Sequence, residues 1–404
     1  MSDADSADPS VPGLATRLLH AGLSRSQHRE NNPALYLTSS YVFHSAEQAR
    51  AVFAEEEAGN IYSRFTNPSV AFFEERLALL EGGEKALATA TGMAAVSTLF
   101  LSLLSAGDHL VISRSVFGST TNIARQILPR FGIQVTAVTL SDLDAWRAAI
   151  TPQTRMFFAE TPANPTLEMV DLAALGHMAR EHDILLAVDN VFSTPILQRP
   201  LELGAHVCIH SATKYLDGQG RVMGGALVGP RDLLMGRVFP FLRNTGPSLS
   251  PFNAWTLAKS LETLELRVMR HCDNAEHVAA HLAAHPHAGV KVLFPGLPDH
   301  PQHDLARRQM SRFGGLVCLE LGSRARAHAF IDALQRATIT ANLGDSRTLV
   351  THPATTTHAR VSPADRQAAG VTEGLVRLSM GLENAADLVA DIQQALEQVP
   401  PMES

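Results

Sequence analysis

From about residue 86 onward, short apolar runs alternate with amphipathic segments. The strand-like runs are Ala86–Thr89, Leu110–Ser113, Gln134–Val138, Arg155–Ala159, Ile184–Val188, His206–His210 and Ala226–Val228. The helix-like segments between the earlier runs are Met93–Leu104, Thr121–Phe131, Leu143–Ile150 and Leu172–His182. This alternation predicts an α/β chain with a mostly parallel sheet between helices. Ligands bind such sheets beyond the carboxyl ends of the strands, so those ends are where site residues are sought.

The chain before this region has a weaker pattern. Residues 1–12 are polar and are expected to be disordered, and residues 13–68 are expected to be irregular. A helix is predicted to begin at Ser69 and to stop at Gly82, because apolar residues recur there at helical spacing. We therefore expect an N-terminal arm over residues 1–68, followed by a large domain over 69–264.

The C-terminal part predicts a smaller α+β domain over residues 265–404. A long helical stretch, Ala254–Ala283, leads into it. Strands are expected at Gly315–Leu321 and Leu375–Met380, and a last helix near Ala385–Gln398.

Composition is that of a soluble globular enzyme and disfavours several other classes. Of 404 residues, 45% are hydrophobic and 18% charged, and the net charge is −7 without a basic block, which disfavours nucleic acid as a partner. No apolar run reaches membrane-spanning length, and the acidic first residues lack the pattern of a signal peptide. The three cysteines form no CxxC pair, which disfavours disulfides and cysteine zinc sites. The expected compartment is the cytoplasm.

Lys214 lies where a reactive amine would be placed. It follows the apolar run His206–His210 in the turn Ser211-Ala212-Thr213-Lys214, and the chain has only three other lysines. Hydroxyl groups beside a lysine at a strand end suggest a Schiff base next to a phosphate site, the arrangement that pyridoxal phosphate requires. By itself, such a lysine is more often a solvated surface group.

Two further strand ends carry matching chemistry. Gly92 and Met93 open a helix after Ala86–Thr89, and the backbone N–H groups of a helix start can hold a phosphate. Asp189 follows Ile184–Val188, and a carboxylate emerging from an apolar strand needs a partner such as a pyridinium nitrogen. A tight turn and a helix cap are the structural alternatives for these positions. Together, however, phosphate site, acid and lysine favour pyridoxal phosphate.

Other cofactor and metal motifs fit less well. Gly218-Gln219-Gly220 lacks the third glycine of a dinucleotide fingerprint, and no P-loop motif occurs. His281 and His285 have the spacing of helix-borne metal ligands, but the neighbouring Pro286 and His287 favour a solvated helix end, so no metal is expected.

The motifs resemble the Cys/Met-metabolism family of pyridoxal-phosphate enzymes, which includes cystathionine γ-synthase, cystathionine γ-lyase and the homoserine sulfhydrylases. The resemblance runs from about Thr16 to the last helix and rests on Asp189-Asn190 and Ser211-Ala212-Thr213-Lys214-Tyr215. Ser115–Ser119, His210–Gly225 and Asn342–Asp345 are most similar to the sulfhydrylases with a succinylated donor. The resemblance implies the PLP-dependent transferase fold type I, the fold of aspartate aminotransferase.

The resemblance also implies residue roles. Lys214 would bind the cofactor aldehyde, Asp189 the ring nitrogen and Asn164 the phenolic oxygen. The phosphate would be held by Ser211, Thr213, Gly92, Met93 and, from a neighbouring subunit, Tyr62 and Arg64. Arg377 would fork onto the substrate's α-carboxylate, with Asn342 as a further substrate-binding residue. The alternative for Arg377 is an exposed strand residue.

Phe117 departs from the pattern of most relatives, which place a tyrosine over the cofactor ring. A phenyl ring stacks but cannot exchange a proton. A carboxylate such as succinate leaves without protonation, since its acid has a pKa of about 4–5, so Phe117 favours an O-acyl-homoserine donor. The resemblance then implies replacement of succinate in O-succinyl-L-homoserine by sulfide, a step of methionine biosynthesis.

Several alternatives stay open at this point. Cysteine could be the nucleophile, as in cystathionine γ-synthase, or an O-acetyl donor could be used, as in O-acetylhomoserine sulfhydrylase. A non-catalytic binding or regulatory subunit is a third possibility, which the set of Lys214, Asp189 and Arg377 disfavours. Arg114 and Arg347 are candidates for binding the distal succinyl carboxylate. The resemblance implies a homotetramer, a dimer of dimers with shared active sites, and no nucleic-acid or membrane partner.

Overall fold

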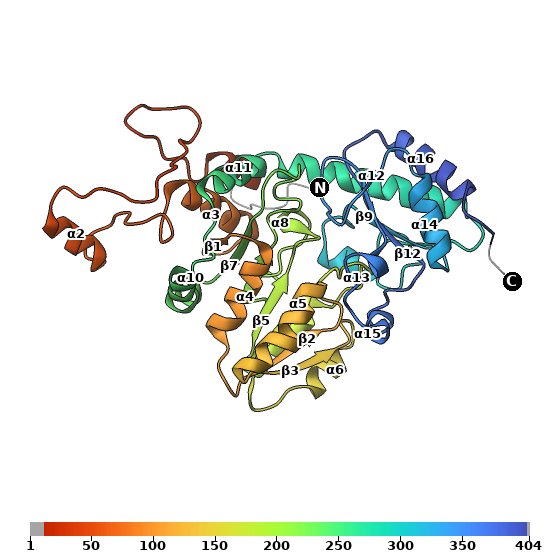
Figure 1. The fold of residues 1–404 in the computed structure, drawn as a ribbon, viewed down its shortest axis with the longest axis horizontal. Helices are drawn as coiled ribbons and strands as arrows, with labels where there is room; N and C mark the ends of the chain where they lie inside the picture. Colours follow the sequence, from red (N-terminus) through yellow and green to blue (C-terminus); the bar gives the residue numbers. More distant parts are fainter. Residues whose placement is uncertain (1–11, 402–404) are drawn as a thin grey trace. The chain divides into compact units, whose positions relative to one another are not determined.

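The computed structural model describes residues 12–401 of the chain (Figure 1). The predicted disorder at the N-terminus therefore lies almost entirely outside the described residues. The chain divides into two compact units. The first comprises Met1–Leu103, Ile209–Asp217 and Arg221–Thr263, and the second comprises Leu104–Cys208, Gly218–Gly220 and Leu264–Ser404. The division into an arm and two domains stays a prediction.

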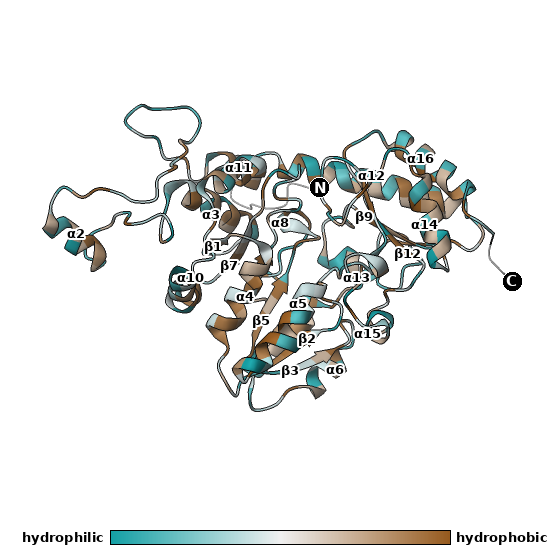
Figure 2. Ribbon diagram, viewed as in Figure 1, coloured by the Kyte–Doolittle hydropathy of each residue, from teal (hydrophilic) through white to brown (hydrophobic). Residues whose placement is uncertain are grey.

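The larger sheet has seven strands in the order β1-β7-β6-β5-β4-β2-β3. Their bounds are β1 Lys85–Thr89, β2 His109–Ser113, β3 Gln134–Val138, β4 Thr154–Glu160, β5 Leu185–Asp189, β6 Val207–His210 and β7 Gly225–Gly229. Strands β3, β2, β4 and β5 pair in parallel, and β1 pairs with β7 antiparallel. The predicted α/β class with a mostly parallel sheet is confirmed. Strand β5 is mostly brown in Figure 2, as its buried apolar residues require.

A smaller sheet of five strands lies in the second unit, in the order β10-β11-β12-β9-β8. Its strands are β8 Lys291–Leu293, β9 Leu316–Glu320, β10 Thr338–Ile339, β11 Leu349–Thr351 and β12 Leu375–Ser379. Helices α12 (Leu264–Ala284), α14 (Arg324–Ala333) and α16 (Ala385–Glu397) share an apolar core with it. Buried residues such as Leu319, Phe330, Leu378 and Ile392 belong to that core, so the predicted C-terminal strands and last helix are confirmed.

Helix α3 (Pro68–Glu81) shows how local sequence fixes an element of the first unit. The Asn67 side chain accepts a hydrogen bond from Ser69 N, and Pro68 supplies a fixed φ at the first helical position. Gly82 ends the helix at φ 70°, in the left-handed region that favours glycine. The predicted stop at Gly82 is therefore confirmed, and the start lies one residue before Ser69.

Two predicted helices are divided in the structure. The segment Thr121–Phe131 is covered by α5 (Gly118–Asn122), a π-helix (Ile123–Ile127) and a 3₁₀ turn (Leu128–Phe131), because Pro129 cannot continue an α-helical ladder. The stretch Ala254–Ala283 is divided into α11 (Pro251–Leu261) and α12. Next to this break the Ala258 carbonyl accepts from Arg76 Nη1 at 3.0 Å, in place of the helical N–H of residue 262.

The expectation of an irregular segment over residues 13–68 was wrong for two short helices, α1 (Leu14–His20) and α2 (Ala46–Phe53). The start of α2 carries a local signal, because Ser45 accepts from Gln48 N and the Gln48 side chain accepts from His44 N. Long loops flank α2 (Figure 1). The remaining helices are α4 Gly92–Leu103, α6 Leu143–Ala148, α7 Leu172–Glu181, α8 Thr194–Leu197, α9 Arg231–Leu233, α10 Phe239–Thr245, α13 His303–Gln309 and α15 Pro363–Ala368. Within residues 12–401, no helix has the length and apolarity needed to span a membrane.

Candidate active site

In the first unit, Lys214 lies on a tight turn after β6. Lys214 N donates to the Ser211 carbonyl at 3.2 Å, and Asp217 N donates to the Ala212 carbonyl at 2.9 Å. Thr213 Oγ1 accepts from Gly224 N at 3.1 Å, which ties this turn to the segment before β7. Lys214 is half-buried. The Lys214 amine and the hydroxyl groups of Ser211 and Thr213 thus belong to one hydrogen-bonded turn after β6.

The start of α4 lies directly against this turn. A Cβ on Gly92 would come within 2.7 Å of Ser211 Cβ and 2.9 Å of Ser211 Cα, so only glycine fits there. Thr91 Oγ1 accepts from Ala94 N at 3.0 Å, which caps the start of α4, and backbone N–H groups at a helix start can hold an anion. The structure therefore brings Gly92, Met93, Ser211 and Thr213 together, as a phosphate site requires.

A buried hydrogen bond connects the end of β6 to the end of α3. His210 Nε2 makes a hydrogen bond with Glu81 Oε1, and the His210 and Glu81 side chains are 1% and 0% exposed. Sequence reasoning missed this contact, because Glu81 lies at the end of α3, far away along the chain.

In the second unit, two acids end neighbouring strands. Asp189 ends β5 and Glu160 ends β4, and the two residues are paired in register. Glu160 is only 4% exposed and accepts from Phe117 N at 2.7 Å and from Asn164 N at 3.2 Å. Burial, followed by the negative charge of Asp189, raises the pKa of Glu160 well above its ordinary value. Two adjacent acids at a strand end suit a cationic ligand. Glu160 was missed, although it follows a predicted strand as Asp189 does.

Arg377 is buried, so the alternative interpretation of it as an exposed strand residue is wrong. It is 1% exposed in β12, which is buried along its whole length. Its Nη1 donates to Asn164 Oδ1 at 2.8 Å and its Nη2 donates to the Asn342 carbonyl at 3.0 Å. Since Asn164 accepts at Oδ1, its Nδ2 is the donor side that a phenolic oxygen would need. The Arg377 guanidinium thus contacts two other predicted site residues, Asn164 and Asn342.

His358 is a buried neighbour of this cluster that sequence reasoning also missed. Burial, followed by the positive charges of Arg377 and Arg366, lowers the pKa of His358 to about 4. The imidazole is therefore neutral at pH 7. No single sequence motif marks this position.

Tyr62 and Arg64 lie in the N-terminal segment and form their own cluster in the first unit. The Arg64 guanidinium lies 4.7 Å from the ring centroid of Phe65 and 5.6 Å from that of Tyr62, and its Nη1 donates to the Arg243 carbonyl. Tyr62 is 41% exposed. Their predicted role in a neighbouring subunit's site stays a prediction.

The two histidines considered as metal ligands stack on each other, with ring centroids 4.3 Å apart, and His285 Nδ1 lies 3.0 Å from the His281 carbonyl. In the described part of the chain, no group of three or more His, Cys, Asp or Glu residues could hold a metal ion.

Comparison with known proteins connects this geometry to a family. A family model for "Cys/Met metabolism PLP-dependent enzyme" matches residues 15–397. An O-succinylhomoserine sulfhydrylase of Pseudomonas aeruginosa is 52% identical over 98% of this chain and 98% of its own. One of Mycobacterium tuberculosis is 47% identical over 96% of this chain and 97% of its own. A solved Campylobacter jejuni structure, which contains N'-pyridoxyl-lysine-5'-monophosphate, is 34% identical with a TM-score of 0.91 over 95% of this chain and 99% of that chain.

Proposed function

Since the chain belongs to the Cys/Met metabolism PLP-dependent enzyme family, we propose that it replaces the succinyloxy group of O-succinyl-L-homoserine with sulfide, giving L-homocysteine and succinate. The observation that carries this proposal is the 52% identity to an O-succinylhomoserine sulfhydrylase over nearly the whole of both chains. The predicted cytoplasmic location and the absence of nucleic-acid and membrane partners stay predictions.

The residues present fit pyridoxal phosphate. The close approach of Gly92 and Ser211 at the start of α4 leaves backbone N–H groups and hydroxyls together, which suits a phosphate. Lys214, on the same turn as Ser211, would supply the amine that binds the aldehyde. Asp189, next to the buried Glu160, would pair with the ring nitrogen and keep it protonated. These roles follow from the resemblance and from local geometry within each unit.

Each residue would then perform a limited task. Bound pyridoxal phosphate supplies an aldehyde that condenses with amines and a ring that accepts electrons from the α-carbon. Lys214 would take the α-proton and then a β-proton, since these lie on neighbouring carbons. Arg377 would hold the α-carboxylate, oriented by its bonds to Asn164 and to the Asn342 carbonyl. In the net reaction the Cγ–O bond breaks, succinate leaves, and a Cγ–S bond forms with sulfide.

A panel of donors and nucleophiles tests this proposal. Purified enzyme is assayed with O-succinyl- and O-acetyl-L-homoserine, each with sulfide and with cysteine, and homocysteine, cystathionine and released acid are quantified. We expect the highest kcat/KM for the succinyl donor with sulfide. A strong preference for cysteine, or for the acetyl donor, would replace the proposal by cystathionine γ-synthesis or O-acetylhomoserine sulfhydrylation. Lys214→Ala is the matched control, and it should lose both turnover and the borohydride-trapped cofactor adduct.

We propose further that the enzyme is a homotetramer whose sites are shared between subunits. Large apolar side chains of the N-terminal segment are solvent-exposed in the single chain, with Leu37 68%, Val42 98% and Phe53 62% exposed. Exposed apolar side chains of this size favour coverage by another protein surface. A second copy of this chain would cover these side chains and would receive Tyr62 and Arg64 at its phosphate site, as the family resemblance implies.

A further inference from the structure

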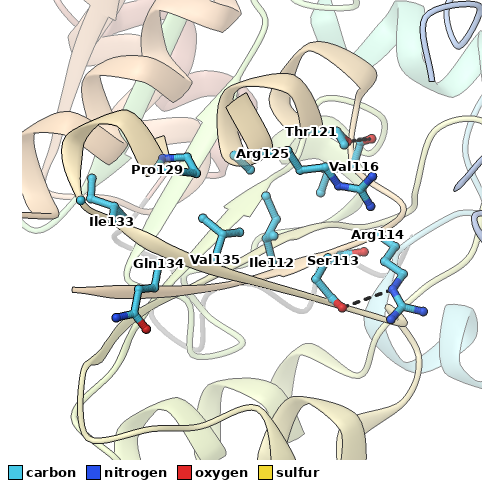
Figure 3. A pocket seen from close by; sticks show the side chains of 13 residues that line it. Ile112, Ser113, Arg114, Val116, Thr121, Arg125, Pro129, Ile133, Gln134 and Val135 are labelled. Atoms are coloured by element: carbon cyan, nitrogen blue, oxygen red, sulfur yellow. Dashed lines mark hydrogen bonds between the residues drawn. The ribbon is translucent and has the colours of Figure 1, made fainter. Parts of the chain in front are cut away.

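A pocket in the second unit is lined by two arginines, Arg114 and Arg125. It has a volume of about 500 Å³ and lies between the β2–β3 strands and the α5–π-helix segment (Figure 3). Its floor is apolar, formed by side chains such as Ile112, Val116 and Val135. Figure 3 shows Arg114 and Arg125 at one end of this pocket, away from Ile133 and Gln134. Both guanidinium groups are thus presented at the same end.

A second cavity, of only about 20 Å³, lies at that end. It shares Arg114, Val116 and Arg125 with the first pocket, and Asn164 and His358 also line it. Asn164 accepts from Arg377, the residue proposed to hold the α-carboxylate. Arg114 therefore lines the same small cavity as Asn164, the residue that Arg377 contacts.

Within residues 12–401, Arg125 forms an ion pair at this cavity, whereas Arg114 forms none. Arg125 Nη1 lies 2.6 Å from Asp365 Oδ2, which forms an ion pair. That hydrogen bond, followed by one from Ser362, lowers the pKa of Asp365, and the charge of Arg114 acts in the same direction. Asp365 is therefore ionised at pH 7 and offsets one positive charge.

Arg114 is held in a geometry that presents its guanidinium. Its backbone N–H donates to the Val138 carbonyl at 2.8 Å, and its Nε donates to the Ala137 carbonyl at 3.2 Å. The terminal Nη1 and Nη2 groups then form the fork that a carboxylate prefers. Like Arg114, the other candidate, Arg347, is exposed, but its Nε lies 3.4 Å from Asp345 Oδ1. Its charge is offset by its own neighbour.

We propose that Arg114 binds the distal carboxylate of the succinyl group and thereby selects the donor. The inference rests on the proposed function and deepens it. The donor is an amino acid with two carboxylates, one for Arg377 and one for Arg114, and its methylene groups would contact apolar side chains such as Val116. An O-acetyl donor lacks the second carboxylate and gains nothing from Arg114.

The test compares donors rather than activity alone. Arg114→Gln keeps a polar side chain but removes the charge, and Arg336→Gln is the matched control at an exposed arginine that lines neither cavity. With sulfide as nucleophile, Arg114→Gln should raise KM for O-succinyl-L-homoserine at least about tenfold, as expected for loss of a charge-assisted pair. Its KM for O-acetyl-L-homoserine should change less than about twofold. Arg336→Gln should alter neither value.

Inhibition by free succinate gives a second measurement, independent of turnover of the succinyl donor. With the acetyl donor as substrate, succinate should inhibit the wild type and should inhibit Arg114→Gln at least about tenfold more weakly. If Arg114→Gln fails to fold, Arg114→Lys serves instead, with a smaller loss confined to the succinyl donor. Equal effects on both donors, or no effect, would overturn the role of Arg114 while leaving the proposed function intact. A wild type that does not turn over the succinyl donor would overturn the proposed function itself.

Discussion

Gly92 offers a quantitative test of the phosphate site, because the space around it is defined by the turn that carries Lys214. In Gly92→Ala, the new methyl would lie 2.7 Å from Ser211 Cβ and 2.9 Å from Ser211 Cα. Ordinary carbon contacts are about 3.5–4.0 Å, so the helix start and the turn must separate by roughly 1 Å. A backbone atom is involved, and a rotamer change of Ser211 therefore cannot remove the clash.

The expected magnitude follows from this overlap. Overpacking of this kind costs about 1–3 kcal/mol. If this whole cost falls on cofactor binding, it corresponds to a loss of affinity of about 5–150-fold. We therefore expect Gly92→Ala to raise the Kd of the apoenzyme for pyridoxal phosphate by that factor. The α4 helix itself should persist, since alanine favours a helix more than glycine does.

Titration of apoenzyme with pyridoxal phosphate, followed by absorbance, measures this Kd. Gly236→Ala is the matched control, because Gly236 lies in the π-helix Leu234–Val238 and a Cβ there would meet nothing within 4 Å. The control should keep the wild-type Kd within about twofold. If Gly92→Ala binds the cofactor as tightly as Gly236→Ala does, then the approach of Gly92 to Ser211 does not form the phosphate site. Thermal unfolding of both apoenzymes would show whether the strain is present without cofactor.

Three further predictions test other parts of the site. Because the pKa of Glu160 is raised in the folded protein, the contribution of Glu160 to the free energy of unfolding is present below pH 4.5 and is lost as the pH rises toward the folded pKa. Urea unfolding of the apoenzyme at several pH values should show this decline in the wild type but not in Glu160→Gln. Parallel pH profiles of wild type and variant would refute the pKa shift. Phe117→Tyr should add a proton donor and increase thiol release from homocysteine at least about tenfold, measured with a thiol reagent; an unchanged rate would remove the argument from Phe117. Mixing Arg64→Ala with Lys214→Ala subunits should restore activity through hybrid sites, whereas an inactive mixture would count against shared sites.

Much of the fold could be predicted because its signals are local. The limits of α3 depend on Asn67, Pro68 and Gly82, all of them within one residue of the helix ends. The division of the long helix near residue 262 could not be predicted, because it involves the contact of Arg76 with the Ala258 carbonyl across 182 positions of sequence. Periodicity reports which face of an element is apolar, but not which distant side chain will take one of its carbonyl groups.

The burial of Arg377 shows a second limit of the same kind. The alternation of Val376, Arg377 and Leu378 correctly places the arginine on the opposite face of β12 from its neighbours. Alternation cannot say whether that opposite face meets water or protein. Every residue of β12 is buried and Arg377 is only 1% exposed, so the face that carries the arginine meets protein. The family resemblance supplied its predicted role, which periodicity alone could not.

Glu160 connects site residues that lie in separate segments of the sequence. Its carboxyl group accepts from the backbone of Phe117, which precedes α5, and from that of Asn164 in the loop after β4. Asn164 in turn accepts from Arg377 in β12. One buried acid thus sets the position of the expected ring-stacking residue and, through one intermediate, that of the α-carboxylate ligand. A variant at Glu160 should therefore change KM for the amino-acid donor as well as cofactor affinity, whereas Gly92→Ala, which affects only the phosphate end, should change cofactor affinity first.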